Sequence, residues 1–226
     1  MKAAILACGV LLCLPPSVLA QANGGAGAGE ESSDARKERE LKIGGIIQAL
    51  GLKEGANVAD IGAGDGFYEI SLSRAIGPSG RVYAEDIDEQ RAIKQLQDRV
   101  AKDHLANVEV VLGTADDPKL PSGTLDGVLM VITYHEVADY RKMVEHILAA
   151  LKPGGRFVVV DMMPHKTRTR PRADQTKNHV IDADLAESEM RQAGFEVVSR
   201  DDRFIDNPDE ESTRWMIAFR KPMARP

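Results

Sequence analysis

The chain contains 226 residues, of which 43% are hydrophobic and 28% are charged. This length is enough for one α/β domain with a sizeable core, and the hydrophobic share excludes a disordered protein. The formal net charge of −6 argues against a general nucleic-acid-binding protein, whose surface would carry a basic patch. We therefore expect a folded domain with no nucleic-acid partner.

The first residues have the composition of a secretory signal peptide, which we assign to residues 1–20. Lys2 supplies a short basic start, and residues 3–14 form an apolar run that is too short to span a bilayer. We predict cleavage after Ala20, no stable membrane insertion afterwards, and a periplasmic location if the host is a Gram-negative bacterium. A retained membrane anchor is the alternative.

Both cysteines lie inside this segment. Cys8 fits a lipoprotein signal only loosely, because too few residues precede it, and bulky Leu12 comes before Cys13. Cleavage would leave a mature chain without cysteine, and therefore without a disulfide or a thiol ligand.

The predicted domain covers residues 34–226 and follows a flexible linker of Gly, Ala and Ser at residues 21–33. Its first helix is predicted from about residue 34 to Leu50. Gly51 would end this helix, and Gly44-Gly45 would mark a kink within it.

Short β-rich runs then alternate with amphipathic segments. Strands are predicted at residues 58–61, 81–85, 108–112, 125–133, 156–161 and 195–200, with a seventh around Trp215. The helices between them are predicted around Leu72, after Asp88, and at residues 138–151 and 183–193. This alternation predicts an α/β fold, a three-layer sandwich in which helices cover both faces of a mainly parallel sheet.

A glycine-rich turn follows the first predicted strand, with the sequence Asp60-Ile61-Gly62-Ala63-Gly64-Asp65-Gly66. Alternate glycines allow positive φ and a close approach of the backbone to a ligand, and the next helix offers free N–H groups. Dinucleotide sites have G-x-G-x-x-G instead, so a nicotinamide dehydrogenase is disfavoured. An acid before the glycines repels a pyrophosphate but suits the ammonium group of an amino-acid-like ligand.

This turn and its context resemble the class I (Rossmann-like) S-adenosylmethionine-dependent methyltransferases over roughly residues 40–221. The resemblance implies a seven-stranded sheet whose last strand is antiparallel, and S-adenosylmethionine as the cofactor. It also implies cofactor-binding roles for five residues of the turn: Asp60, Gly62, Ala63, Gly64 and Gly66.

The same resemblance implies cofactor contacts after the second and third strands. Asp86, preferred over neighbouring Glu85, would accept hydrogen bonds from the ribose hydroxyls, and Ile87 would pack against the adenine. After the third strand the family commonly has Gly-Asp-Ala, whereas this chain has Gly113-Thr114-Ala115-Asp116. Thr114 departs from the pattern, so Ala115 and the substitute acid Asp116 are the expected contacts there.

Three polar residues follow the fourth and fifth predicted strands, at the edge where open α/β sheets bind ligands. His135 is either a general base or a structural histidine. Tyr134 either lines the pocket or caps the core. Asp161 either orients an acceptor or holds a loop backbone. All three are candidate catalytic residues, although a base is needed only if the nucleophile must lose a proton.

Basic side chains gather after the fifth predicted strand, at His165, Lys166, Arg168, Arg170, Arg172, Lys177 and His179. They form either a lid over an anionic small-molecule acceptor or a solvated loop. His179 also resembles an acceptor-side position of small-molecule methyltransferases. No His, Asp or Glu pair has metal-ligand spacing on a predicted helix, so we expect no metal site.

Two functions remain open from the sequence. The first is in-line transfer of a methyl group from S-adenosylmethionine to a small-molecule acceptor. The second is a non-catalytic, methyltransferase-like protein that binds a nucleoside or other small ligand in the periplasm. Thr114 and the lack of a defined base fit the second, whereas the intact Asp60 and Asp86 weigh against it.

Overall fold

The computed structural model describes residues 33–163, 169–207 and 212–224. The predicted signal peptide and all but the last residue of the predicted linker lie outside the described residues. Residues Ser33–Pro226 cluster into one unit. Within the described ranges, no helix is both long enough and apolar enough to cross a membrane.

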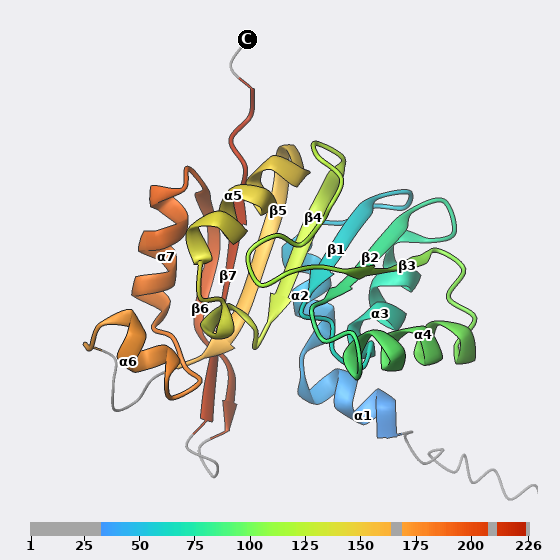
Figure 1. Ribbon diagram of the computed structural model, residues 1–226, viewed down its shortest axis with the longest axis horizontal. Helices are drawn as coiled ribbons and strands as arrows, with labels where there is room; N and C mark the ends of the chain where they lie inside the picture. The colour runs from blue at the N-terminus through green and yellow to red at the C-terminus, as the bar shows by residue number, and fades with distance from the viewer. Residues whose placement is uncertain (1–32, 164–168, 208–211, 225–226) are drawn as a thin grey trace, which may run out of the picture. The chain divides into compact units, whose positions relative to one another are not determined.

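A seven-stranded sheet with the order β3-β2-β1-β4-β5-β7-β6 forms the centre of this unit (Figure 1). Neighbours among β1 to β5 are parallel, whereas β7 is antiparallel to both β5 and β6. The predicted fold class, with its antiparallel last strand, is therefore confirmed. The strands are β1 (Asn57–Ile61), β2 (Arg81–Asp86), β3 (Val108–Leu112), β4 (Leu125–Val131), β5 (Leu151–Met162), β6 (Glu196–Asn207) and β7 (Ser212–Arg220).

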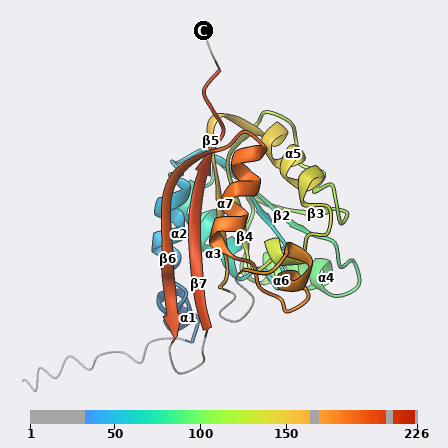
Figure 2. The same cartoon turned by 90° about the vertical axis from the view of Figure 1, so that its left-hand side faces the viewer.

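Helices cover both faces of the sheet (Figures 1 and 2). Apolar side chains of α2 and α3 pack on one face, and those of α5 and α7 pack on the other. The helices are α1 (Ser33–Glu40), α2 (Ile43–Leu50), α3 (Phe67–Ile76), α4 (Ala92–Lys102), the 3₁₀ helix η1 (Tyr134–Glu136), α5 (Tyr140–Ala150), α6 (Arg172–Thr176) and α7 (Ala183–Gln192).

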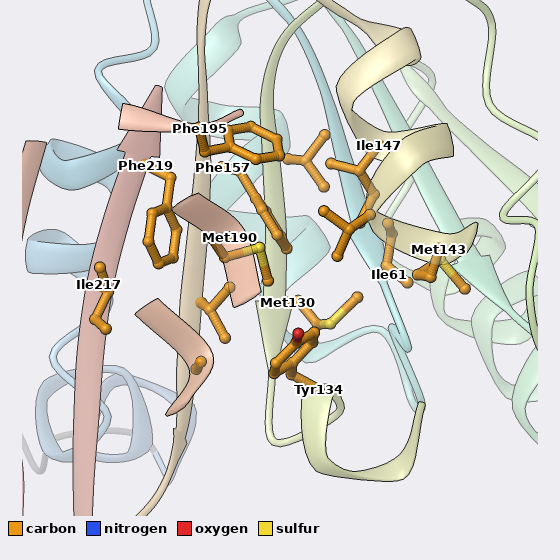
Figure 3. Packing of buried hydrophobic residues seen from close by; sticks show 14 of the residues in the cluster. Ile61, Met130, Tyr134, Met143, Ile147, Phe157, Met190, Phe195, Ile217 and Phe219 are labelled. Atoms are coloured by element: carbon orange, nitrogen blue, oxygen red, sulfur yellow. The ribbon is translucent and has the colours of Figure 1, made fainter. Parts of the chain in front are cut away.

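The larger core lies between the sheet and helices α5 and α7. Aromatic rings from β5, β7 and Phe195, the residue before β6, gather there, and Tyr134 of η1 lies at the end of the cluster (Figure 3). Phe157 and Phe219 are fully buried, with ring centroids 6.2 Å apart. This packing fixes the carboxyl ends of β4 and β5, where ligands bind in such sheets.

Some element boundaries differ from those predicted. The first helix is broken at Lys42, which has φ 50°, and not at Gly44-Gly45, so it forms α1 and α2. β5 begins at Leu151 because that residue already pairs with Leu125 of β4, across a register shift. β6 continues to Asn207 because it pairs with β7 along its length, which the polar sequence after Arg200 does not reveal.

Candidate functional site

The glycine-rich turn connects β1 to α3 in a conformation that side chains resist. Gly62, Gly64 and Gly66 have φ of +74°, +61° and +76°. A Cβ on Gly62 would lie 2.4 Å from Oγ1 of Thr133, whereas one on Gly64 would meet no atom within 4 Å. The turn therefore packs tightly against the segment after β4 on one side and is open at Gly64.

The end of β2 holds this turn in place. The N–H groups of Gly62 and Ala63 both donate to the Glu85 carbonyl at 2.9 Å. The Asp86 carboxylate accepts from the Gly64 N–H at 3.0 Å and from the Asp88 N–H at 2.9 Å. Ile87, the next residue, is 56% exposed, so its apolar side chain is accessible for packing against a flat ring of a ligand. The structure therefore brings together the residues predicted from the first and second strands.

Three buried acids lie under the turn. Asp60, Glu69 and Glu85 are each at most 1% exposed. Asp60 Oδ2, both carboxylate oxygens of Glu69 and Glu85 Oε1 have no hydrogen-bond donor among the described residues. Orphaned buried oxygens of this kind suit a cationic ligand group such as an ammonium. Glu69 was not among the predicted site residues, although it falls in the first helical turn after Gly66, and Glu85 was considered only as the alternative to Asp86.

The pKa values of these acids are displaced upward. Burial, followed by repulsion from Glu69 and the other nearby acids, holds the pKa of Asp60 well above its ordinary value. Burial raises the pKa of Glu69 to about 7 and that of Glu85 to about 8. Near neutral pH the cluster therefore holds protons that a bound cation would displace.

We expect the free energy of unfolding of the ligand-free protein to fall as the pH rises from about 5 to about 8. The native state holds protons on Glu69 and Glu85 up to pH of about 7 and 8, whereas the unfolded chain loses them near the ordinary value of 4.5. The unfolded state therefore binds fewer protons across this range, and stability decreases with pH. The loss should amount to a few kcal/mol, since one pKa unit corresponds to about 1.4 kcal/mol.

Urea unfolding at several pH values measures this slope. Glu85→Gln should flatten the profile because it removes one of the buried carboxyls whose pKa is raised. A wild-type profile that rises between pH 5 and pH 8 would contradict the assignment. Acids with a lowered pKa, such as Asp117, act below this range and do not affect the comparison.

The expected adenine contacts lie in a tight turn after β3. Thr114 Oγ1 donates to Asp116 Oδ1 at 3.1 Å, and Lys142 of α5 donates to Asp116 Oδ2 at 3.2 Å. These two bonds lower the pKa of Asp116. The Asp116 side chain is 44% exposed, so a ligand can reach it. The adenine roles of Ala115 and Asp116 stay predictions.

On the acceptor side, Asp161 at the end of β5 binds His135 of η1 twice. Its Oδ2 accepts from the His135 backbone N–H at 3.0 Å, and its Oδ1 lies 2.7 Å from His135 Nδ1. Oδ1 also accepts from the Met162 N–H at 2.7 Å. Burial lowers the pKa of His135, but the bond to Asp161 and the charge of that carboxylate outweigh it, so the pKa is raised. Asp161 therefore both orients His135 and holds a loop backbone.

Two further residues extend this dyad. His135 Nε2 lies 3.0 Å from Glu136 Oε1, and the same oxygen lies 2.5 Å from His179 Nδ1. The two imidazole rings meet edge to face, with centroids 5.8 Å apart. The bond from His179, which outweighs burial, lowers the pKa of Glu136. The expectation that no metal-ligating group exists considered only residues close in sequence, whereas this cluster joins positions 43 apart.

Tyr134 is a core residue and offers no hydroxyl to a ligand. Its ring is fully buried, and its hydroxyl donates to Glu189 Oε2 at 2.6 Å. Arg172 donates to the same oxygen at 2.7 Å and to the Tyr134 carbonyl at 3.1 Å. The catalytic reading of Tyr134 is therefore replaced by its alternative, that it caps the core.

The residues of the predicted basic lid do not share one environment in the structure. Arg172 is paired with Glu189 and begins α6, so it is not a mobile surface cation. His165, Lys166 and Arg168 lie outside the described residues. An open groove of about 670 Å³ lies beside η1, and its lining includes His135, Glu136, Tyr140, Arg141, Arg172 and Lys177. This volume is typical of small-molecule sites.

The strand order, the glycine-rich turn and the buried acids beneath it are those of a class I S-adenosylmethionine-dependent methyltransferase fold, and comparisons with known proteins agree. The family described as "Methyltransferase domain" matches residues 58–155. A solved S-adenosylmethionine-dependent methyltransferase from Aquifex aeolicus is 26% identical, with a TM-score of 0.68 over 83% of this chain and 94% of that one. The chain therefore contains a methyltransferase domain with the class I fold, and these similarities imply S-adenosylmethionine as its cofactor.

Curated relatives are similar over a shorter stretch. A demethylmenaquinone methyltransferase of Geobacillus sp. (strain WCH70) is 28% identical over 51% of this chain and 49% of its own length. The ubiquinone/menaquinone biosynthesis C-methyltransferase UbiE of Pasteurella multocida is 31% identical over 51% of this chain and 43% of its own. The chain thus spans about half the length of these relatives. Nothing in these comparisons supports the non-catalytic alternative.

Proposed function

We propose that this chain transfers the methyl group of S-adenosylmethionine to a small molecule that carries an acidic hydroxyl, such as a phenol. The single observation that carries the proposal is the His135–Asp161 dyad at the carboxyl ends of β4 and β5. Thr133, two residues before His135, packs against Gly62 of the cofactor turn. Proton acceptor and cofactor turn are therefore neighbours, as a methyl transfer coupled to proton removal needs.

The cofactor would be held by residues whose unmet polar atoms fit it. The orphaned Asp60 Oδ2 suits an ammonium group, and Asp86 has acceptor capacity for hydroxyl groups. Exposed Ile87, together with Ala115 and Asp116, would contact an adenine ring. When bound, S-adenosylmethionine supplies an electrophilic methyl group on a cationic sulfonium.

On the acceptor side, the histidine cluster would take the hydroxyl proton. Asp161 keeps His135 Nδ1 occupied, Nε2 lies against Glu136, and both residues line the groove beside η1. Arg141 and Lys177 give this groove a positive lining that suits an anionic or phenolate-like acceptor. Because curated relatives are named demethylmenaquinone methyltransferases, reduced naphthoquinones are the first acceptors to test.

We also propose that the protein acts in the periplasm of a Gram-negative host, because residues 1–20 have the pattern of a secretory signal. Such a location requires S-adenosylmethionine outside the cytosol. A fusion of residues 1–30 to a reporter enzyme that is active only after export tests this part. Reporter activity that stays in the cytoplasm would contradict it.

Labelled methyl transfer from S-adenosylmethionine to a panel of phenols and reduced naphthoquinones tests the activity. We expect His135→Gln to lower kcat by about 10²- to 10⁴-fold, the usual contribution of acid–base catalysis, with an unchanged Kd for the cofactor. His146→Gln is the matched control, because this exposed histidine on α5 lies outside the cluster. Full activity of His135→Gln, or no transfer to any hydroxyl-bearing acceptor by wild-type protein that binds the cofactor, would overturn the proposal.

A further inference from the structure

The cluster beside the groove contains a complete set of metal-ligand atoms. His135 Nε2, Glu136 Oε1 and His179 Nδ1 all lie within 4.8 Å of one another. The carboxylate oxygen lies between the two ring nitrogens, 3.0 Å from the first and 2.5 Å from the second. Two imidazoles and one carboxylate are the donors that recur in catalytic zinc and non-haem iron sites.

His135 is oriented as a metal-binding histidine is. Its Nδ1 faces the buried Asp161 carboxylate at 2.7 Å. This contact keeps the Nδ1 proton in place and leaves the Nε2 lone pair for a ligand, as in carboxylate–histidine–metal arrangements. Asp161 is fully buried and also accepts from two backbone N–H groups, so the ring has a fixed direction.

His179 is also held in position by the fold. It has φ +55°, a left-handed conformation that costs a residue with a side chain some strain. Its own N–H donates to Thr176, and two residues later the Ile181 N–H donates to the Met162 carbonyl at 3.1 Å. The Ile181 carbonyl in turn accepts from the buried indole of Trp215 at 2.8 Å. The strained turn is therefore anchored to β5 and β7, which favours a prearranged ligand over a chance surface contact.

One side of the cluster is closed and the other is open. The side chain of His135 is 3% exposed, whereas those of Glu136 and His179 are 55% and 74% exposed. Three protein ligands with a solvent-facing side match a catalytic site, which keeps one coordination position for water or substrate. The nitrogen donors favour zinc-like divalent ions over Mg²⁺ and Ca²⁺, which prefer oxygen ligands.

We propose that His135, Glu136 and His179 bind one divalent transition-metal ion of the zinc class, with Asp161 orienting His135. The open coordination position would take the hydroxyl oxygen of the acceptor. In the metal-bound protein His135 Nε2 is a ligand and cannot also accept a proton, so the metal takes over that role. Coordination would lower the pKa of the hydroxyl, whose proton leaves to solvent while the oxygen stays on the metal. The metal site stands independently of methyl transfer, and only this activating role rests on the proposed function.

A Co²⁺ titration of the untagged, metal-free protein tests the site directly. Cobalt reports its own coordination through visible absorption, and Zn²⁺ is expected to displace it whereas Mg²⁺ at the same concentration is not. We expect saturation at one ion per chain. His179→Ala and Glu136→Gln should each weaken the Kd by at least about 10-fold, and Asp161→Asn by about 10- to 100-fold.

His146→Ala is the matched control for a lost exposed histidine and should bind Co²⁺ as the wild type does. The His179 and Glu136 side chains are mostly exposed, so these variants should fold, and circular dichroism checks that they do. Absence of saturable binding, or equal weakening in His179→Ala and His146→Ala, would overturn the site.

Activity measurements separate this inference from the proposed function. One-to-one metal binding without methyl transfer to any acceptor would leave the site standing and remove the proposed function. Suppose instead that chelator-treated protein binds no Co²⁺ and still transfers methyl groups undiminished. This result would remove the metal site and leave the proposed function standing. Loss of transfer on chelation and its recovery with Zn²⁺ or Co²⁺ would support both.

Discussion

Replacing Asp60 by asparagine is expected to abolish S-adenosylmethionine binding while leaving the ligand-free protein at least as stable as the wild type. The carboxylate is 1% exposed, has an oxygen without a donor and lies among Glu69, Glu85 and Asp86. Without the cofactor its charge is a burden, because burial and repulsion both oppose ionisation. With the cofactor it becomes the partner of a cation, and the loss of such a buried pair weakens binding by at least about 100-fold.

Calorimetric titration of the cofactor and thermal unfolding of the ligand-free protein measure the two halves of this prediction. Asp98→Asn is the matched control, because Asp98 is an exposed acid on α4. It should change neither quantity by more than about 0.5 kcal/mol. Wild-type cofactor affinity in Asp60→Asn would contradict the assigned role. A large drop in its thermal stability would contradict the claim that the charge is a burden in the ligand-free state.

Gly62→Ala is expected to destabilise the protein by several kcal/mol and to remove cofactor binding with it. The new Cβ would lie 2.4 Å from Oγ1 and 2.5 Å from Cγ2 of Thr133, at a φ of +74°. The clash and the backbone strain act together, and relief requires the turn to separate from the segment after β4.

Gly64→Ala separates these two causes. Gly64 has φ +61°, but a Cβ there meets no atom within 4 Å, so only the strain of about 1–2 kcal/mol remains. Urea unfolding should rank the wild type first, Gly64→Ala second and Gly62→Ala last. An equal loss of unfolding free energy in the two variants would mean that the clash with Thr133 does not contribute to the destabilisation.

Local sequence was enough to predict which residues gather around the glycine-rich turn, and their cofactor-binding roles stay predictions. Asp60, the three glycines and Asp86 lie at or just after the carboxyl ends of adjacent parallel strands, so their positions in the sequence place them together at one edge of the sheet. The alternation of strands and helices likewise predicted the sheet. Glu69 was missed because its role depends on burial, and in the sequence an acid after a glycine-rich turn cannot be told from a surface acid.

The acceptor side depends on contacts between segments that are distant in sequence. His179 joins Glu136 only because α6 and the following turn fold back over η1, and no spacing rule connects these two positions. The buried position of Tyr134 could not be predicted for the same reason, because its partners Glu189 and Arg172 come from later helices. The catalytic roles of His135 and Asp161 stay predictions, although the dyad itself gives them a shared geometry.

The anchoring of His179 through Ile181 to Trp215 has a consequence for the order in which the protein is assembled. The strands β3, β2, β1 and β4 are neighbours in the sheet and lie within residues 57–131, so the cofactor turn has all its strand partners early in synthesis. The Ile181 carbonyl meets its indole partner 34 residues later, on β7. The turn that carries His179 is therefore completed after the glycine-rich turn, because its bond to Trp215 can form only once β7 has been synthesised. A nascent chain passes through a stage at which the strands around the glycine-rich turn are present but the strand that anchors the His179 turn is not.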